Sequence, residues 1–457
     1  MFKRLSIIVF ILILMTSNTL AYADNLQNML DMLNQLPDEV DLPEGFEFPD
    51  GFELPDGMEL PDGMNLPDGM NLPGGMNLPD GMELPDGMNL PDGMNLPDGM
   101  NLPDGMNLPD GMKMLDGMET QLTSTPLTQV EASVVGINPQ LLTSMETYLK
   151  SNSKYTHLDA ILIAKDGQLA YSYYADPLNK DTPSPVFSVT KTITSMIIGI
   201  AEDKQILNTD EPVLNYFDNT LLDNITIDKK NILIKHLMTM QSGLVWGEED
   251  DMGVFIDLYS KSLNPFSGTH IPNTMMRLPM DVKPGTTFNY NSMHGNILDE
   301  VLFKASGIRL KEYADLHLFG PLGIHTYEFE KSNSDGSYFG GKGLSMTAED
   351  MMKIGLLIDN GGKLGDVQLL SKAYIDKATK PVISRNGKPP LNYGYSFNYD
   401  EGAIRFAGAG GQRIDVYDAA NLVIVYKVKT DLYGASTDTM EADLSYLTNT
   451  FILKSIQ

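Results

Sequence analysis

Residues 187–203 read FSVTKTITSMIIGIAED and place the hydroxyl of Ser188 one helical turn before the amine of Lys191. The apolar side chains that follow recur at three- and four-residue intervals, which is typical of a helix that buries a broad face. Two prolines, Pro183 and Pro185, limit how far upstream this helix can begin. The sequence therefore predicts a largely buried helix over residues 187–203, with Ser188 and Lys191 at its N-terminal end.

Ser188 and Lys191 have the chemistry of a nucleophile and its base. The positive end of the helix macrodipole and burial both disfavour an ammonium group, so we expect Lys191 to be neutral and able to accept the Ser188 proton. The backbone N–H of Ser188 would form one half of an oxyanion hole. A second Ser-x-x-Lys, from Ser151 to Lys154, follows a helical pattern over residues 138–149 in a polar stretch. We interpret that copy as a solvated helix end.

Four later stretches carry further polar and glycine-containing motifs, at residues 234–244, 283–292, 340–351 and 406–412. In this order and at these separations, they and the Ser-x-x-Lys helix resemble the penicillin-recognising serine hydrolases, which include class C β-lactamases, DD-peptidases and related esterases. The resemblance is strongest to the 6-aminohexanoate-dimer hydrolase branch, since Tyr290-Asn291-Ser292 has serine in its third place as that branch does. It covers roughly the last 320 residues, the length of one large domain.

The resemblance implies an α+β fold of the β-lactamase/transpeptidase type. An antiparallel sheet built from both ends of the domain would be flanked by helices, with a helical lobe inserted and Ser188 at the junction. The resemblance also implies an acyl-enzyme mechanism with Ser188 as nucleophile, Lys191 as base and Tyr290 as proton donor to the leaving group. The N–H groups of Ser188 and Ala409 would hold the oxyanion, and Gly408 would let a substrate lie close to its strand.

Local patterns agree with that architecture. Residues 158–174 predict two strands around a turn at 165–167, and residues 413–417 and 422–428 predict another pair. A closing helix is expected at about residues 437–453. Helical patterns fill the middle of the domain, where the inserted lobe would lie.

The third motif of the family is incomplete in this chain. Where the family has Lys-Thr-Gly or His-x-Gly, this chain has Phe406-Ala407-Gly408, so the cation and hydroxyl that bind a substrate carboxylate in the family are missing. We therefore expect hydrolysis of small activated esters and of linear amides, and poor turnover of cephalosporins and D-Ala-D-Ala peptides. Arg413 or a lysine of the inserted lobe is the alternative source of the cation. The candidates for lining the substrate pocket are Ser292, Trp246 and Phe406.

Other kinds of site have little support. The six histidines form no pair at i, i+4 spacing and the chain has no cysteine, so we expect no metal site. No Gly-x-Ser-x-Gly elbow and no phosphate-binding glycine loop followed by lysine occur, so neither a Ser-His-Asp hydrolase nor a nucleotide site is expected. We therefore predict an enzyme that needs no cofactor.

The N-terminal part of the chain predicts export and a spacer. A basic start, a short apolar run and a small-x-small cleavage signature indicate a signal peptide over 1–23, and the apolar run is too short for a comfortable membrane span. We expect a secreted or periplasmic protein without a membrane span after cleavage. The predicted domains are the signal peptide 1–23, a polar lead-in 24–41, a repeat spacer 42–118, a linker 119–136 and the hydrolase domain 137–457.

The spacer repeats a six-residue unit, mostly Asn-Leu-Pro-Asp-Gly-Met, with proline at each step from Pro43 to Pro109. Residues 24–118 hold 21 Asp and Glu against one Lys, a net charge of −20 out of the −29 of the whole chain. Such a charge disfavours nucleic acid as a partner. Proline removes a ladder donor from each unit, so we prefer an acidic disordered or loosely spiralled spacer to a β-helix. Contact with a surface, or binding of Ca²⁺ or Cu(I), is a candidate role for the tract.

The sequence leaves three functions open. We expect an exported serine hydrolase that cleaves ester or amide bonds of a small molecule or peptide through an acyl-enzyme on Ser188. The first alternative is a β-lactamase or DD-peptidase that acts on substrates of the cell-wall type. The second is a surface interaction protein with a catalytically weak, hydrolase-like domain.

Overall fold

The computed structural model describes residues 127–246, 252–264, 266–429 and 437–456, without positions 219, 221, 223, 386, 388 and 389. The predicted signal peptide, lead-in and repeat spacer lie outside the described residues, as do positions 119–126 of the predicted linker. The described residues thus comprise the predicted hydrolase domain and the residues directly before it.

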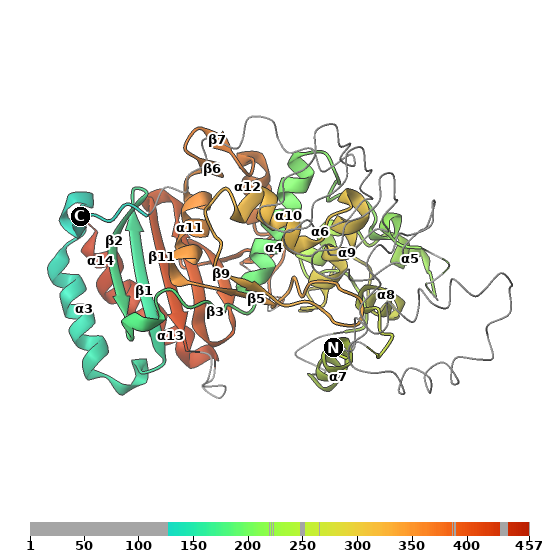
Figure 1. Ribbon diagram of the computed structural model, residues 1–457, viewed down its shortest axis with the longest axis horizontal. Coiled ribbons are helices and arrows are strands. Elements are labelled where there is room, and N and C mark those ends of the chain that lie inside the picture. The colour runs from blue at the N-terminus through green and yellow to red at the C-terminus, as the bar shows by residue number, and fades with distance from the viewer. Residues whose placement is uncertain are drawn as a thin grey trace, which may run out of the picture. The chain divides into compact units, whose positions relative to one another are not determined.

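A six-stranded antiparallel sheet organises one side of the domain, with strand order β2-β1-β11-β10-β9-β8 (Figure 1). Two strands come from the start of the domain and four from its end, which confirms the predicted sheet built from both ends. The strands are β1 (Leu158–Lys165), β2 (Gln168–Tyr174), β8 (Asn398–Asp400), β9 (Ala403–Gly408), β10 (Gln412–Tyr417) and β11 (Leu422–Val428).

The hairpin turns follow from their sequences. Between β1 and β2, Asp166 and Gly167 both have positive φ, 50° and 76°, as a tight type I′ turn requires. Between β10 and β11 the chain passes through a 3₁₀ turn and leaves it at Asn421, whose φ is 45°. Asparagine, aspartate and glycine tolerate this left-handed region better than other residues do. Both predicted hairpins are thus confirmed.

Helices cover both faces of the sheet. Alternate residues of β1 face opposite sides: Ile161 and Ile163 join one core cluster, whereas Leu162 and Ala164 join the other. The first cluster includes residues of α3 (Pro139–Ser151) and α13 (Thr437–Leu447), and a π turn links α13 to the last helix, α14 (Leu453–Ser455). The second cluster includes residues of α4 (Val189–Asp203) and α11 (Ala348–Asp359).

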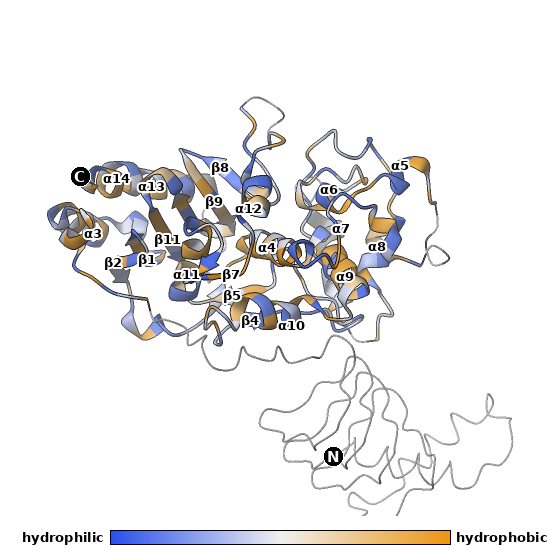
Figure 2. Cartoon of the chain, turned by 90° about the horizontal axis from the view of Figure 1, so that it is seen from above, coloured by the Kyte–Doolittle hydropathy of each residue, from blue (hydrophilic) through white to orange (hydrophobic). Residues whose placement is uncertain are grey.

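Helix α4 lies between the sheet and the helical lobe. It packs against β9 and β10 on one side and against α9 and α10 on the other, and its residues from Val189 to Ala201 are all buried. Figure 2 shows the corresponding hydrophobic colour along α4. The predicted buried helix is therefore confirmed. The helices beyond it are α5 (Ile227–Lys230), α6 (Ile234–Met238), α7 (Met252–Ser262), α8 (Ile271–Arg277), α9 (His294–Ser306), α10 (Leu310–Ala314) and α12 (Lys372–Thr379).

Short strands connect the lobe to the sheet side. Strand β5 (Leu344–Met346) pairs with β3 (Ser184–Pro185) and with β4 (Glu328–Phe329), and β6 (Lys363–Leu364) pairs with β7 (Val367–Gln368). Because only Val186 and Phe187 separate β3 from Ser188, the pairing of β3 with β5 fixes where the N-terminal end of α4 lies.

The fold extends to the N-terminal side of residue 137. Val130 N–H donates to the Leu169 carbonyl at 3.0 Å, and Ala132 and Val135 are buried in the cluster under α3. The second half of the predicted linker is therefore packed on β2.

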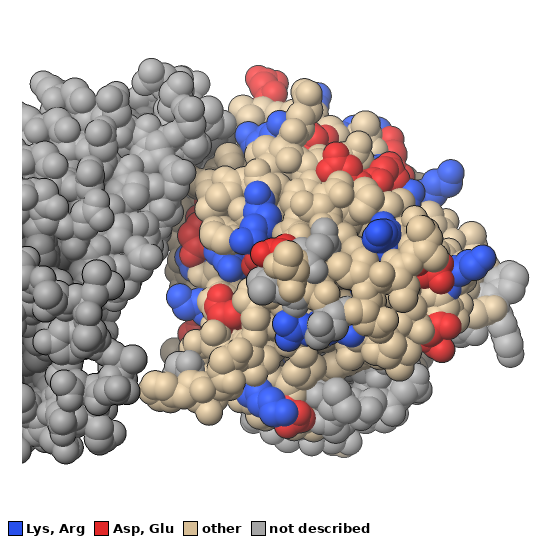
Figure 3. All heavy atoms as spheres, turned by 90° about the vertical axis from the view of Figure 1, so that its right-hand side faces the viewer, with Lys and Arg blue, Asp and Glu red and all other residues tan. Residues whose placement is uncertain are grey.

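The surface of the helical side carries charges of both signs. Figure 3 shows Lys and Arg interspersed with Asp and Glu on this face, so the strong negative charge of the chain is not concentrated there. Within the described residues, no helix has both the length and the apolarity needed to span a bilayer.

Candidate active site

Ser188 occupies the cap position at the N-terminal end of α4. The residue before it, Phe187, has a φ of 48°. Residues other than glycine, asparagine and aspartate rarely adopt this left-handed backbone conformation. Just upstream, Val186 N–H donates to the Leu344 carbonyl at 2.9 Å and so holds this entry to β5. Such backbone strain persists only where neighbouring structure imposes it, and it is common at active sites.

Lys191 lies one turn into α4, and its side chain is only 5% exposed. Its Nζ is 2.9 Å from Ser188 Oγ, 2.7 Å from Ser292 Oγ and 2.7 Å from the Gly341 carbonyl oxygen. A neutral amine can donate to the carbonyl and to Ser292 while its lone pair accepts the Ser188 proton. The geometry thus suits the base role that the sequence predicted.

Tyr290 provides the second polar contact of the nucleophile. Its hydroxyl lies 2.6 Å from Ser188 Oγ, and Lys191 Nζ stands 4.6 Å from the centre of its ring. The residue belongs to the segment between α8 and α9, far from α4 in sequence. Folding therefore brings a hydroxyl, an amine and a phenol together at one point, and each can exchange a proton with the next.

Close backbone approach explains the glycines at 340–341. A Cβ atom on Gly341 would collide with the carbonyl oxygen of Ser292, and Thr194 Oγ1 of α4 donates to the Gly340 carbonyl at 2.7 Å. This packing aims the Gly341 carbonyl at Lys191. The motif at 340–351 is visible in the sequence, but its pattern indicated no role for Gly341. The pair of adjacent glycines was the feature of the sequence that could have indicated a close approach between two backbone segments here.

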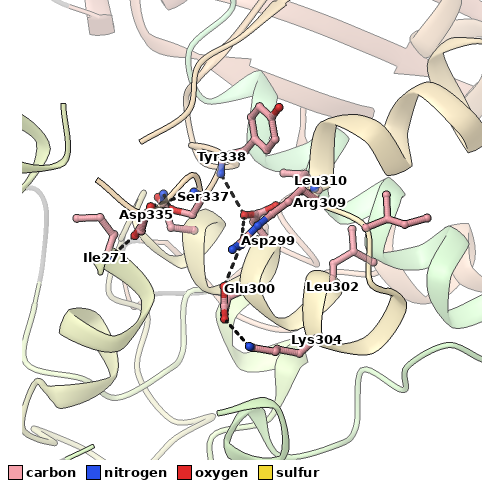
Figure 4. Close-up of polar contacts among 12 residues, drawn as sticks. Ile271, Asp299, Glu300, Leu302, Lys304, Arg309, Leu310, Asp335, Ser337 and Tyr338 are labelled. Carbon is pink, nitrogen blue, oxygen red and sulfur yellow. Dashed lines mark hydrogen bonds and ion pairs between the residues drawn. The ribbon is translucent and has the colours of Figure 1, made fainter. Parts of the chain in front are cut away.

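A buried carboxylate on α9 anchors the chain that leads into residues 340–341 (Figure 4). Asp299 of α9 accepts from Leu310 N–H at 2.7 Å, from the Arg309 guanidinium at 2.8 Å and from Tyr338 N–H at 3.1 Å. Burial raises the pKa of Asp299 to about 6. The carboxylate thus ties α9, whose N-terminal end follows Ser292, to the chain that leads into Gly341.

Strand β9 ends beside the nucleophile. A Cβ atom on Gly408 would collide with the Val186 carbonyl oxygen and would stand 3.3 Å from Ser188 N, so only glycine fits there. The next residue, Ala409, begins a turn in which Gly410 and Gly411 have φ of 75° and 94°. Ala409 therefore follows directly on the residue that packs against the Ser188 amide, which is where a second oxyanion donor is needed.

The residues predicted to line the substrate pocket have different surroundings. Ser292 contacts Lys191, as described above. Phe406 is 0% exposed and packs edge to face on Phe397 at 5.2 Å, so its side chain belongs to the core. Trp246 is buried in the core under the helical lobe, and its Nε1 has no hydrogen-bond partner among the described residues.

Arg413 does not replace the missing cation of the third motif. It is 2% exposed, and its guanidinium is bound to Asp415 of the same strand, with Glu401 3.9 Å away. It also contacts Ser445 of α13, on the sheet face opposite α4. The suggestion that Arg413 serves the site is therefore wrong, because its charge is already neutralised in the core behind the sheet.

The histidine next to the site has a structural environment. His294 is buried at the start of α9, with Nδ1 3.1 Å from the Leu237 carbonyl oxygen and Nε2 3.0 Å from Ser242 Oγ. Burial lowers the pKa of His294 to about 4, so the ring is neutral near pH 7. Within the described residues, no three His, Asp or Glu side chains are grouped so that they could hold a metal ion.

The sequence matches a known protein family over most of the domain. The match is to the family described as Beta-lactamase, and it covers residues 156–444. A curated relative, the 6-aminohexanoate-dimer hydrolase of Paenarthrobacter ureafaciens, is 21% identical over 243 residues, which cover 50% of this chain. The chain spans 58% of the length of that relative.

Solved structures with the same fold include enzymes and penicillin-binding proteins. A family VIII carboxylesterase is 17% identical with a TM-score of 0.51, and the match covers 68% of this chain and 98% of that one. A penicillin binding protein from Bacillus halodurans is 19% identical with a TM-score of 0.50, covering 67% of this chain and 99% of the other. At these identities the likeness shows the fold.

Proposed function

This chain belongs to the Beta-lactamase family of penicillin-recognising serine hydrolases, and we propose that it is an exported enzyme that cleaves ester or amide bonds through an acyl-enzyme on Ser188. One observation carries the proposal. Ser188 Oγ lies at hydrogen-bond distance from both Lys191 Nζ, at 2.9 Å, and Tyr290 Oη, at 2.6 Å. A nucleophile that touches both a base and a second proton carrier is the arrangement that acyl transfer needs.

Acylation begins when Ser188 Oγ bonds to the substrate carbonyl carbon and its proton passes to Lys191. The N–H groups of Ser188 and Ala409 stabilise the oxyanion. When the tetrahedral intermediate collapses, the bond to the leaving group breaks and the Tyr290 hydroxyl gives that group its proton. The Lys191 ammonium then returns a proton to the phenolate oxygen, which restores both side chains.

Deacylation uses the same groups in reverse. A water molecule adds to the acyl carbonyl and gives a proton to the Tyr290 and Lys191 pair. The ester bond to Ser188 breaks, and Oγ takes that proton back as the acid leaves. No group beyond these side chains and backbone amides is required.

Export is part of the proposal because residues 1–23 have the features of a signal peptide. The acidic repeat at 42–118 would then lie outside the cytoplasm as a spacer before the enzyme domain. Its negative charge would disfavour contact with anionic surfaces. Fractionation of expressing cells tests this, since enzyme found only in the cytoplasm would contradict it.

Labelling with a fluorophosphonate probe tests the nucleophile. The chain offers a matched control, because Ser151 also stands three residues before a lysine, but it is exposed and Lys154 is paired with Asp443 at 2.5 Å. We expect Ser188→Ala to abolish labelling and Ser151→Ala to leave it intact, with both variants checked for folding by circular dichroism. Labelling that survives in Ser188→Ala would remove the assignment.

A further inference from the structure

An arginine lies beside the site on a segment that belongs to none of the family motifs. The guanidinium of Arg385 is 5.5 Å from the centre of the Tyr290 ring and 6.0 Å from that of Phe288. Its backbone N–H donates to Asn392 Oδ1 at 3.1 Å, and its side chain donates to Asn398 Oδ1 at 3.2 Å. Two asparagines therefore hold the residue so that its guanidinium lies over the ring of Tyr290, whose hydroxyl contacts Ser188.

Three other arginines of the domain are wholly or partly buried, and their charges have partners that the charge of Arg385 lacks among the described residues. Arg309, Arg405 and Arg413 all form ion pairs with carboxylates. Arg385 is exposed, and among the described residues no carboxylate lies within ion-pair distance of it. A guanidinium has five N–H donors in a planar fork, and the amide of Asn398 uses only part of this capacity. The remaining donors can bind a planar anion.

We propose that Arg385 binds a carboxylate on the leaving-group side of the substrate. This rests on the proposed function, in which Tyr290 gives its proton to the leaving group, so a cation over that ring faces the departing part of the substrate. The edge-to-face contact of Phe288 with Tyr393, at 5.1 Å, places further apolar surface around the guanidinium. Arginine pairs with carboxylates through two parallel hydrogen bonds, and partial desolvation strengthens them.

The proposal changes the expected substrate class. The third motif lacks a cation at Phe406-Ala407, and from this the sequence predicted poor recognition of carboxylates. Arg385 supplies a cation from a different segment, between α12 and β8. Esters or amides whose leaving group carries a carboxylate, such as an amino acid or a hydroxy acid, are therefore the preferred substrates.

Acetate esters that share the acetyl group and differ in the leaving group test the proposal. Phenyl acetate has a neutral leaving group, 3-acetoxybenzoate has an anionic one, and the methyl ester of 3-acetoxybenzoate controls for size. The measured quantity is the ratio of kcat/KM for the anionic ester to that for the neutral ester. It is compared for the wild type, Arg385→Gln, Arg385→Lys and the control Lys372→Gln, which removes an exposed cation paired with Asp376 on α12.

We expect Arg385→Gln to lower this ratio about 10-fold to 100-fold, as loss of a charge-assisted contact does. Arg385→Lys should lower it less, because the charge remains without the fork, and added salt should lower the ratio of the wild type. An unchanged ratio in Arg385→Gln, or an equal fall in Lys372→Gln, would overturn the role of Arg385 while leaving the esterase intact. If the wild type hydrolyses neither ester and Ser188 takes no label, the proposed function fails and the role of Arg385 fails with it.

Discussion

Replacement of Tyr290 by phenylalanine removes one hydroxyl group and keeps the aromatic ring. The hydroxyl lies 2.6 Å from Ser188 Oγ. The ring contacts with Lys191 at 4.6 Å, Phe288 at 6.4 Å and Arg385 at 5.5 Å do not involve that oxygen and should persist. We therefore expect a folded variant whose free energy of unfolding falls by about 0.5–1.5 kcal/mol, the usual contribution of one hydrogen bond.

The effect on catalysis should be larger and should depend on the leaving group. Proton transfer by a positioned side chain typically contributes 10²-fold to 10⁴-fold, which is about 2.7–5.4 kcal/mol of activation free energy. The amine of an amide and the alkoxide of an alkyl ester are poor leaving groups until they receive a proton. For these substrates Tyr290→Phe should therefore lose activity in that range. A 4-nitrophenolate leaves readily as an anion, so a 4-nitrophenyl ester should lose much less.

The assay measures kcat/KM of the wild type and of Tyr290→Phe for three derivatives of one acid: its 4-nitrophenyl ester, its phenyl ester and its anilide. Thermal unfolding followed by circular dichroism checks that the variant is folded. The proton-donor role predicts that the loss grows from the first substrate to the third. An equal loss for all three, or no loss for the anilide, would refute the role of Tyr290 in leaving-group departure.

Two further predictions concern buried charges. Asp299→Asn leaves one oxygen for three donors, so urea unfolding should show a loss of about 3–5 kcal/mol, against little change for the exposed Asp376→Asn. Burial lowers the pKa of Lys427 from 10.5 to about 7. Above pH 7 the unfolded chain therefore binds more protons at this residue than the folded protein does, and stability rises with pH. Between pH 7 and 9, the free energy of unfolding of the wild type should therefore rise by about 2 kcal/mol relative to that of Lys427→Met. A difference between the two proteins that does not depend on pH would contradict burial as the cause of the lowered pKa.

Local sequence determined the elements that carry the site. The spacing of apolar residues after Ser188 is enough to predict the helix, and Asp166-Gly167 is enough to predict its hairpin turn, because both depend on residues that are neighbours in the chain. The family resemblance added the order of the motifs and with it the sheet built from both ends of the domain. Lys191 could be paired with Ser188 for the same local reason, since they stand one helical turn apart.

Only the tertiary structure decided which distant groups meet these elements. Folding brings the Gly341 carbonyl to Lys191, places Arg385 over the Tyr290 ring and brings Ser445 of α13 to Arg413 on the other face of the sheet. Nothing in the local pattern around these residues distinguishes them. A pattern along the chain reports which face of an element is buried, whereas the partner of a side chain across a core depends on how segments that are distant in the sequence pack together.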